Sequence, residues 1–244
     1  MALPSAFPWD DATFADRTRK AVGNYWKSRS GQSRRQGKRT GKDAGNRKEV
    51  TGGQHLNSFL DMIQQTAVAA GFGEDEILLN RGLELPGYFR PQKRWDLLAI
   101  RGGRLCAAVE LKSQVGSFGN NFNNRSEEAI GNSTDFWTAF REGALGKETP
   151  WLGYFFFLEL ASKSTNPVRL KPSRFPPFPI FEGTSYAKRY EILCERLVLE
   201  RKYTRTALLL SPRGKNGHFE EPAEANLGFR AFLASLHAHL SGCR

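Results

Sequence analysis

The sequence predicts an α/β fold in which helices flank a mixed β-sheet. Three observations support this prediction. An apolar stripe with helical spacing runs through residues 56–70, three short strand-like runs separated by Pro-Gly and Gly-Gly pairs follow it, and residues 151–160 are continuously apolar. Helical periodicity that gives way to short apolar runs is typical of chains whose helices pack on a central sheet.

The first predicted helix covers residues 10–28, because Asp10 or Asp11 can cap its start and apolar residues recur along one stripe. Residues 30–53 contain almost no apolar side chains and cannot contribute to a core, so we expect a mobile loop there. The next predicted helix covers residues 56–70, where apolar residues recur at i, i+3, i+4 and i+7 before a glycine.

Three strands are predicted at residues 77–85, 94–100 and 105–112, with a Pro-Gly and a Gly-Gly pair at the turns between them. Because the second turn is tight, the last two of these strands should be antiparallel neighbours. The remaining predicted elements are a helix at 126–143, a strand at 151–160, a helix at 184–202, a strand at 206–210 and a helix at 223–240. The predicted order is therefore αβββαβ, followed by αβα.

The chain of 244 residues is long enough to bury a sizeable core without disulfides. Cys106, Cys194 and Cys243 are odd in number, widely spaced and form no CxxC pair, which is typical of a reduced cytosolic protein and disfavours structural zinc. The longest apolar run is too short to cross a bilayer. We therefore expect a soluble protein of the cytoplasm with no membrane partner.

The net charge of +11 is concentrated in one segment. Residues 17–48 contain twelve Lys or Arg and one acid, Asp43, whereas the other 212 residues hold 24 basic and 24 acidic side chains. A dense positive segment suits a polyanion, since neutralising phosphates releases condensed counterions, but a solvated, disordered tail would carry the same charge. The candidate DNA contacts in this segment are Arg34, Arg35, Lys38 and Arg39.

The residues that point to chemistry are Asp96 on the second predicted strand and Glu110 and Lys112 at the end of the third. Residues i and i+2 of a strand share a face, so Glu110 and Lys112 point together while Leu111 points into the core. If Asp96 lies beside them on that face, its carboxylate and that of Glu110 can converge on one metal ion.

Mg²⁺ prefers hard oxygen ligands and is usually held by one or two carboxylates together with water and substrate phosphates. Asp96 and Glu110 would be those ligands, the backbone carbonyl of Leu111 could be a further one, and Lys112 could orient the attacking water or neutralise developing charge. The alternative is that Asp96 starts a strand while Glu110 and Lys112 form a surface ion pair. A Glu-x-Lys triplet alone is common, and Glu200 begins a second one without an Asp on a paired strand.

The αβββαβ order with its D…ExK pattern resembles the PD-(D/E)xK nuclease fold. The stretches LPGYFRPQKRWDLLAI, AAVELKS and SFGNNFNNRSEEAIG resemble type II restriction endonucleases of the XhoI family. This resemblance implies Asp96, Glu110 and Lys112 as the catalytic motif and Mg²⁺ as cofactor. Trp95 stands where the motif has proline, but that proline contributes no catalytic atom.

The resemblance also implies a biological setting. The target would be double-stranded DNA at CTCGAG, cut after the first C to leave 5′ overhangs, and the protein would act in the bacterial cytoplasm beside a cognate DNA methyltransferase. A short palindrome presents two phosphates related by a twofold axis, so we expect a C₂ homodimer. Residues 1–53 would then be a helix and a DNA-binding loop, and residues 54–244 a catalytic nuclease domain continuous with them.

An asparagine-rich segment, residues 119–125, is the best candidate for reading DNA sequence, as a loop between the catalytic strand and the next helix. Asn can pair with adenine and Arg with guanine in the major groove. Alternatively, these side chains satisfy their own backbone in a turn. The candidates are Asn120, Asn121, Asn123, Asn124 and Arg125.

Two rival functions share these residues. A junction resolvase or repair nuclease would use the same metal site on a structural target, although the XhoI-like asparagine-rich segment argues against it. A non-catalytic nucleic-acid-binding module would use the basic segment alone, and its carboxylates would be incidental. Dependence on Mg²⁺ separates the enzymes from the module.

Overall fold

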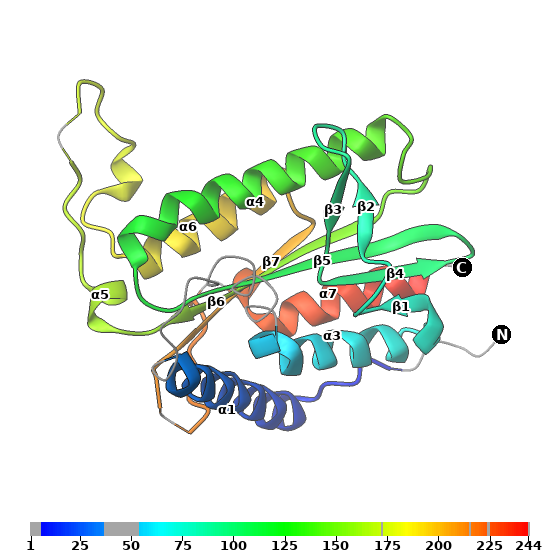
Figure 1. The fold of residues 1–244 in the computed structure, drawn as a ribbon, viewed down its shortest axis with the longest axis horizontal. Coiled ribbons are helices and arrows are strands. Elements are labelled where there is room, and N and C mark those ends of the chain that lie inside the picture. Colours follow the sequence, from blue (N-terminus) through cyan, green and yellow to red (C-terminus); the bar gives the residue numbers. More distant parts are fainter. Residues whose placement is uncertain (1–5, 37–53, 172, 215, 224, 244) are drawn as a thin grey trace.

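A computed structural model of the chain describes residues 6–36, 54–171, 173–214, 216–223 and 225–243 (Figure 1). Its centre is a five-stranded sheet with the order β1-β4-β5-β6-β7. These strands are β1 (Ile77–Leu78), β4 (Leu97–Arg101), β5 (Arg104–Gln114), β6 (Trp151–Glu159) and β7 (Arg205–Ser211). β4 pairs antiparallel with both β1 and β5, whereas β5, β6 and β7 run parallel to one another, which confirms the predicted mixed sheet.

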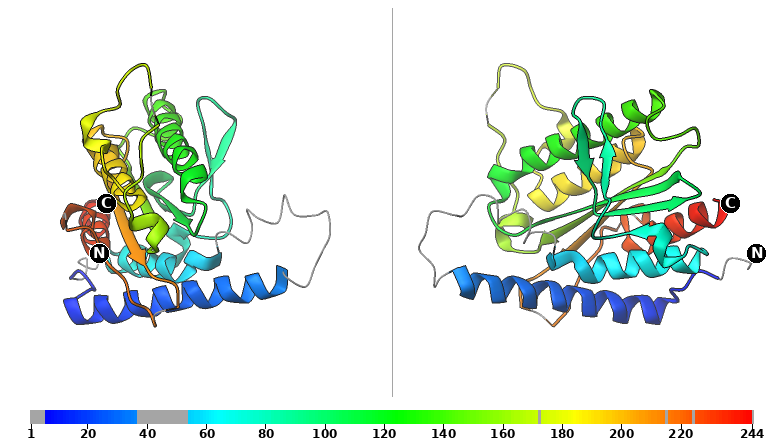
Figure 2. Two further views of the ribbon diagram at one scale, coloured as in Figure 1. Left: turned by 90° about the vertical axis from the view of Figure 1, so that its left-hand side faces the viewer. Right: turned by 45° about the vertical axis from the view of Figure 1, so that its right-hand side comes forward.

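Helices cover both faces of this sheet, as predicted (Figures 1 and 2). One face packs against α1 (Asp11–Gln36), α3 (Asn57–Ala69) and α7 (Phe229–Gly242). The other face packs against α4 (Phe118–Arg141) and α6 (Tyr186–Leu199). The short helices are η1 (Gln54–Leu56), η2 (Glu74–Glu76), α5 (Ser162–Thr165), η3 (Pro179–Phe181) and η4 (Ala225–Leu227). Among the described residues, no helix combines the length and the apolar character that a membrane crossing requires.

The alternation of side chains along β5 divides the protein into two cores. Val109 and Leu111 pack into the core on the side of α3 and α7, whereas Ala108 packs into the core on the side of α4 and α6. Glu110 and Lys112 follow Ala108 at intervals of two and share its face. Two polar side chains are therefore placed between the sheet and helix α4.

Helix α1 is longer than predicted. Tyr25 packs on Phe157 of β6 with ring centroids 4.0 Å apart, and the helix continues to Gln36 instead of ending at residue 28. Arg and Gln in the last turns are good helix formers, so a segment without apolar residues can still extend a helix that is already nucleated. The expected loop from residue 30 is thus wrong as far as Gln36, and residues 37–53 lie outside the described part of the chain.

Two predicted strands are interrupted in the structure. The segment 77–85 contains β1 and the start of β2 (Glu84–Pro86), which are separated by residues 79–83, where Asn80 and Gly82 are poor strand formers. The segment 94–100 is divided between β3 (Gln92–Arg94) and β4. β2 and β3 form a separate antiparallel hairpin that projects past α4 (Figure 1).

The chain changes pairing partner between Trp95 and Asp96. The amide of Trp95 donates to Leu83 O across the hairpin (2.9 Å), and the amide of Asp96 donates to Val109 O of β5 (3.1 Å). Asp96 therefore lies at the junction just before β4 rather than inside a strand. The predicted tight turn between β4 and β5 is confirmed, since Gly102 and Gly103 adopt φ values of 57° and 74°.

The largest correction concerns α4, which begins at Phe118 rather than at residue 126. Phe118 and Phe122 lie four residues apart, on one helical face, and pack on Tyr186 and Tyr190 of α6. Residues 119–125 therefore form the first turns of a helix, and the predicted asparagine-rich loop is wrong. The last helix also differs from its prediction, because α7 begins at Phe229, after the short η4.

Candidate active site

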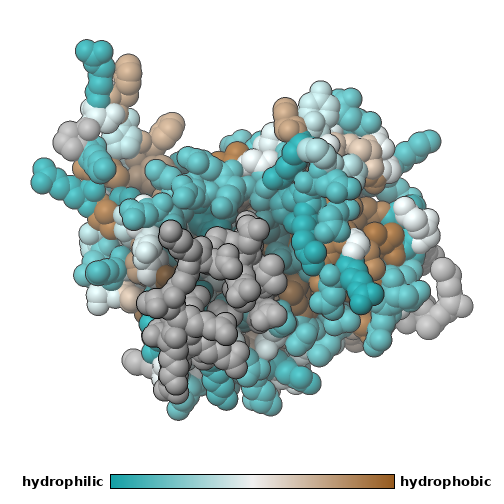
Figure 3. Space-filling model, in the orientation of Figure 1, coloured by the Kyte–Doolittle hydropathy of each residue, from teal (hydrophilic) through white to brown (hydrophobic). Residues whose placement is uncertain are grey.

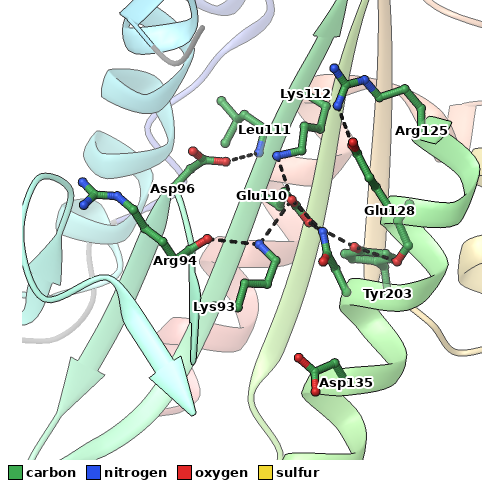
Figure 4. Close-up of polar contacts among 12 residues, drawn as sticks. Lys93, Arg94, Asp96, Glu110, Leu111, Lys112, Arg125, Glu128, Asp135 and Tyr203 are labelled. Atoms are coloured by element: carbon green, nitrogen blue, oxygen red, sulfur yellow. Dashed lines mark hydrogen bonds and ion pairs between the residues drawn. The ribbon is translucent and has the colours of Figure 1, made fainter. Parts of the chain in front are cut away.

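The structure brings Asp96, Glu110 and Lys112 together at one place on the sheet (Figure 4). Leu97 of β4 pairs with Val109 of β5, which puts Asp96 beside Glu110. The amide of Leu111 donates to Asp96 Oδ2 at 2.7 Å, and Lys112 Nζ lies 2.8 Å from Glu110 Oε1. Asp96 and Lys112 therefore both lie beside Glu110, while the sharing of one metal ion by the two carboxylates stays a prediction.

The Glu110 carboxylate is almost fully buried, with 1% of its side chain exposed, and it is surrounded by donors. Asn132 of α4 donates from Nδ2 to both oxygens at 2.9 and 3.0 Å, and the Tyr203 hydroxyl donates to Oε2 at 3.3 Å. Lys93 of the hairpin places its Nζ 3.2 Å from Oε1, the oxygen that Lys112 also contacts. The buried charge is therefore paired and hydrogen-bonded, as burial requires.

Lys93, Asn132 and Tyr203 were not found by sequence reasoning. They come from the hairpin, from α4 and from the turn after α6, and no local periodicity links them to Glu110. Lys93 also lies 3.9 Å from the centre of the Trp95 ring, so Trp95 packs beside a cation of the site. In the sequence, Asn132 and Asp135 lie among apolar residues of a predicted helix. These polar residues on a helix face that packs inward could have indicated a contact with a buried polar group.

The cluster combines two acidic and two basic side chains whose pKa values respond to burial and to one another. Burial alone would raise the pKa of Glu110, but Lys112 and Lys93 lower it to about 2. Burial would lower the pKa of Lys112, whereas Glu110 and Asp96 raise it above its ordinary value. Burial lowers the pKa of Lys93 and raises that of Asp96. Glu110 therefore remains ionised, which a metal ligand requires.

The donor set fits Mg²⁺. Among the described residues, no group of three or more His, Cys, Asp or Glu side chains is arranged to hold a metal ion. Mg²⁺ needs fewer protein ligands, because it keeps several waters and takes oxygens from substrate phosphates. Asp96 and Glu110 supply two carboxylates from neighbouring strands, and no hydrogen bond from a described residue reaches Asp96 Oδ1. The Leu111 side chain is buried in the opposite core as predicted, while its carbonyl as a ligand stays a prediction.

The candidate DNA-binding residues fall into two groups. Lys38 and Arg39, and the side chains of Arg34 and Arg35 at the end of α1, lie outside the described part of the structure. The second group lies on the first turns of α4, where Asn120, Asn123 and Asn124 are exposed and Asn121 and Arg125 are half-buried. Arg125 pairs with Glu128 on the same helix (Figure 4).

Helix α4 connects this second group to the site. Asn132, which contacts Glu110, follows Asn123 by nine residues, or about 14 Å along a helix that rises 1.5 Å per residue. One rigid element thus carries both a contact of the carboxylate and exposed Asn side chains. The site thus contains two carboxylates that can hold a cation and a lysine beside them, and α4 carries exposed polar side chains nearby. This arrangement suits a phosphodiester substrate.

Comparison with known proteins agrees with this chemistry. The type II restriction enzyme BstVI of Geobacillus stearothermophilus is 47% identical over 211 residues, which cover 83% of this chain and 94% of that protein. The type II restriction enzyme XhoI of Xanthomonas vasicola is 43% identical over 207 residues, 83% of each chain. The type II restriction enzyme AbrI of Azospirillum brasilense is 44% identical over 157 residues, which cover 63% of this chain and 70% of that protein.

No solved structure matches the chain significantly. The family described as restriction endonuclease XhoI matches residues 35–221, a range that contains Asp96, Glu110, Lys112 and the three residues that contact Glu110. With the family matched over most of the chain and relatives above 40% identity, the protein belongs to the XhoI family of restriction endonucleases.

Proposed function

We propose that this protein is a type II restriction endonuclease of the PD-(D/E)xK fold that hydrolyses double-stranded DNA with Mg²⁺. The observation that carries the proposal is the position of Asp96 beside Glu110, just before β4, with Lys112 Nζ 2.8 Å from Glu110 Oε1. Membership of the XhoI family supports the same chemistry.

Asp96 and Glu110 would hold the ion, which when bound polarises the scissile phosphate and lowers the pKa of a coordinated water. The chain's own groups do the rest. The Leu111 amide fixes the orientation of the Asp96 carboxylate, and Asn132 and Tyr203 fix that of Glu110. Lys112 presents an ammonium on the same face, where it can orient the attacking water and offset negative charge as the phosphate reacts.

For the target we propose the palindrome CTCGAG, cut after the first C to leave 5′ overhangs. This proposal rests on the resemblance to the XhoI family and on the relative of that name. Base contacts would come from the exposed Asn side chains at the start of α4, and sequence-independent phosphate contacts from Arg34, Arg35, Lys38 and Arg39. The enzyme would act in the bacterial cytoplasm, where a cognate DNA methyltransferase protects the host's own sites.

We also propose a C₂ homodimer that presents one Asp96, Glu110 and Lys112 cluster to each strand, because one such cluster cleaves one phosphodiester at a time and a palindrome contains two related by a twofold axis. Light scattering of the protein, alone and with a CTCGAG duplex, tests this. A monomer under both conditions contradicts it.

The activity is tested by incubating the purified protein with plasmid DNA in the presence and absence of Mg²⁺. Discrete fragments that map to CTCGAG, and only with Mg²⁺, are expected. Smearing would indicate an exonuclease. Cleavage confined to branched DNA would indicate a junction resolvase, and binding without cleavage would indicate a non-catalytic module.

A further inference from the structure

Two aromatic side chains are exposed at the tip of the β2–β3 hairpin. Tyr88 is 55% exposed and Phe89 is 70% exposed, and their rings meet edge to face with centroids 5.0 Å apart. Figure 1 shows the hairpin projecting beside α4, and Figure 3 shows brown and white atoms above it on an otherwise largely hydrophilic face. Apolar side chains grouped at a projecting tip indicate a contact surface.

The tip is held rigidly although its side chains face solvent. Asp135 of α4, whose side chain is only 6% exposed, accepts hydrogen bonds from the amides of Tyr88 and Phe89 at 2.7 and 2.9 Å and from Arg90 Nε at 2.7 Å. A Cβ at Gly87 would lie 2.7 Å from Asp135 Oδ2, so only glycine allows this approach. A buried carboxylate thus fixes the backbone from which the two exposed rings project, which lowers the entropy lost when they bind.

The same tip is joined to the candidate active site. Arg90 Nη2 donates to Asn132 Oδ1 at 2.8 Å, and Asn132 donates to the Glu110 carboxylate. At the base of the hairpin, Lys93 contacts Glu110 directly. A short chain of hydrogen bonds through Arg90 and Asn132 therefore links the tip that carries the rings to Glu110, which is proposed to hold the metal ion.

Exposed cations beside the rings favour a polyanionic partner. Of the four basic side chains in residues 81–94, Lys93 is largely buried against Glu110, but Arg81 is exposed. Arg90 and Arg94 keep 40% and 60% of their side chains exposed while they pair with Asp135 and Glu84. Nucleic acid offers phosphates to the cations and base faces to the rings, and aromatic side chains contact bases by stacking or by insertion at a step.

We propose that the β2–β3 hairpin is a DNA-contacting element in which Tyr88 and Phe89 contact the bases next to the cleaved phosphate. This inference rests on the proposed function, since the duplex must lie at Glu110. The hydrogen bonds through Asp135 and Asn132 hold the rings at a fixed position relative to the site, so the contact helps to set where the duplex sits.

The test compares duplex binding by the full-length protein and the double variant Tyr88→Ala, Phe89→Ala in EDTA, which prevents cleavage. Fluorescence anisotropy gives the affinity, and 2-aminopurine placed in turn at each adenine in and beside CTCGAG reports unstacking. The double variant should lose about tenfold or more in affinity, the size of a lost aromatic contact with a base, together with the 2-aminopurine signal. The ring-retaining variant Tyr88→Phe, Phe89→Tyr should bind like the unmodified protein and show the same signal.

Val68→Ala is the matched control, because Val68 is exposed on α3, which covers the opposite face of the sheet, and no loss is expected there. Unchanged affinity of the double variant overturns the proposal, as does a loss of affinity without any 2-aminopurine signal in the unmodified protein. A third outcome also overturns the proposal: the double variant no longer forms a dimer, and its loss of DNA affinity is no larger than the fraction of monomer explains. The tip would then be a contact between two copies of the chain. The proposed function fails separately, if the unmodified protein does not cleave plasmid DNA with Mg²⁺.

Discussion

The amide of Leu111 donates a 2.7 Å hydrogen bond to Asp96 Oδ2, so the backbone of the strand that carries Glu110 orients the neighbouring carboxylate. Leu111 serves two purposes through different atoms. Its side chain fills the core on the side of α3 and α7, and its amide positions Asp96 at the junction between the hairpin and β4. The separation of Asp96 from Glu110 is therefore set by strand pairing rather than by the flexibility of either side chain.

Replacing Asp96, Glu110 or Lys112 by alanine should lower Mg²⁺-dependent cleavage by orders of magnitude, because each change removes a ligand or a charge at the reacting phosphate. Asp96→Asn is the sharper variant, since its amide oxygen can still accept from the Leu111 amide and should keep stability within about 1 kcal/mol. Plasmid cleavage and urea unfolding measure the two effects. Cleavage by any of these variants at close to the rate of the unmodified protein would refute the site.

Lys93→Met should strengthen Mg²⁺ binding to the DNA-free protein. Lys93 and Lys112 both contact Glu110 Oε1, so an added cation competes with them, and removing one should lower the dissociation constant about tenfold or more. Isothermal titration calorimetry measures it. Arg94→Met, on the same strand but 60% exposed and paired with Glu84, is the matched control and should leave the affinity unchanged. Equal affinity of all three proteins would mean that Lys93 does not compete with the metal.

Neutralising Arg34, Arg35, Lys38 and Arg39 together should weaken binding to specific and random duplexes alike. Each phosphate contact releases counterions, so the slope of log K against log salt should become less steep by up to about 0.9 per lost contact. Titrations at several salt concentrations measure this slope. A loss confined to CTCGAG would instead make these residues base readers, and an unchanged slope would leave the segment without a role in binding.

Asn123→Ala should reduce discrimination between CTCGAG and its single-base variants by roughly 1 to 3 kcal/mol, the size of a lost bidentate contact with a base. The residue is exposed on α4, and no hydrogen bond from another described residue holds its side chain. Binding to the site and to each single-base variant gives the answer. An equal loss on every sequence would make Asn123 a phosphate contact, and no loss would exclude it from the interface. Arg125→Ala is tested in the same way, although Arg125 must first release Glu128.

Glu76→Gln should destabilise the protein at neutral pH by about 1 to 2 kcal/mol but not in strong acid. The side-chain hydrogen bonds from Arg101 lower the pKa of Glu76 from 4.5 to about 2, and the same arginine also holds Gly71 O and Cys243 O. A carboxylate whose pKa is lowered on folding contributes stability above its unfolded pKa and loses it as the pH falls through the folded value.

The difference in free energy of unfolding between Glu76→Gln and the unmodified protein should therefore be full above pH 4.5 and shrink toward pH 2. Urea unfolding at a series of pH values measures it. Glu74→Gln, an exposed residue of the same short helix, should show no such dependence. A difference that persists at pH 2 would mean that the stabilisation does not come from the ionised carboxylate.

Local sequence pattern alone predicts the alternation on β5, the tight turn before it and the face shared by Glu110 and Lys112. These features are local, because a strand's period of two and a glycine turn are set by the backbone of a few neighbouring residues. The clean apolar stripe of α3 was predictable for the same reason. The register that the turn sets would place Asp96 opposite Val109. A shift of one residue between Ala99 and Ile100, which only the structure shows, brings Asp96 beside Glu110 instead.

The surroundings of the carboxylates, in contrast, depend on the packing of segments that are distant in the sequence. Lys93, Asn132 and Tyr203 contact Glu110 from 17, 22 and 93 residues away, and such contacts depend on how a hairpin, a helix and a turn pack rather than on any local pattern. Packing also overrode local preference at the start of α4, where Phe118 and Phe122 pack on α6 and make an asparagine-rich segment helical. Burial of a few large side chains there outweighs the weak helix propensity of the residues between them.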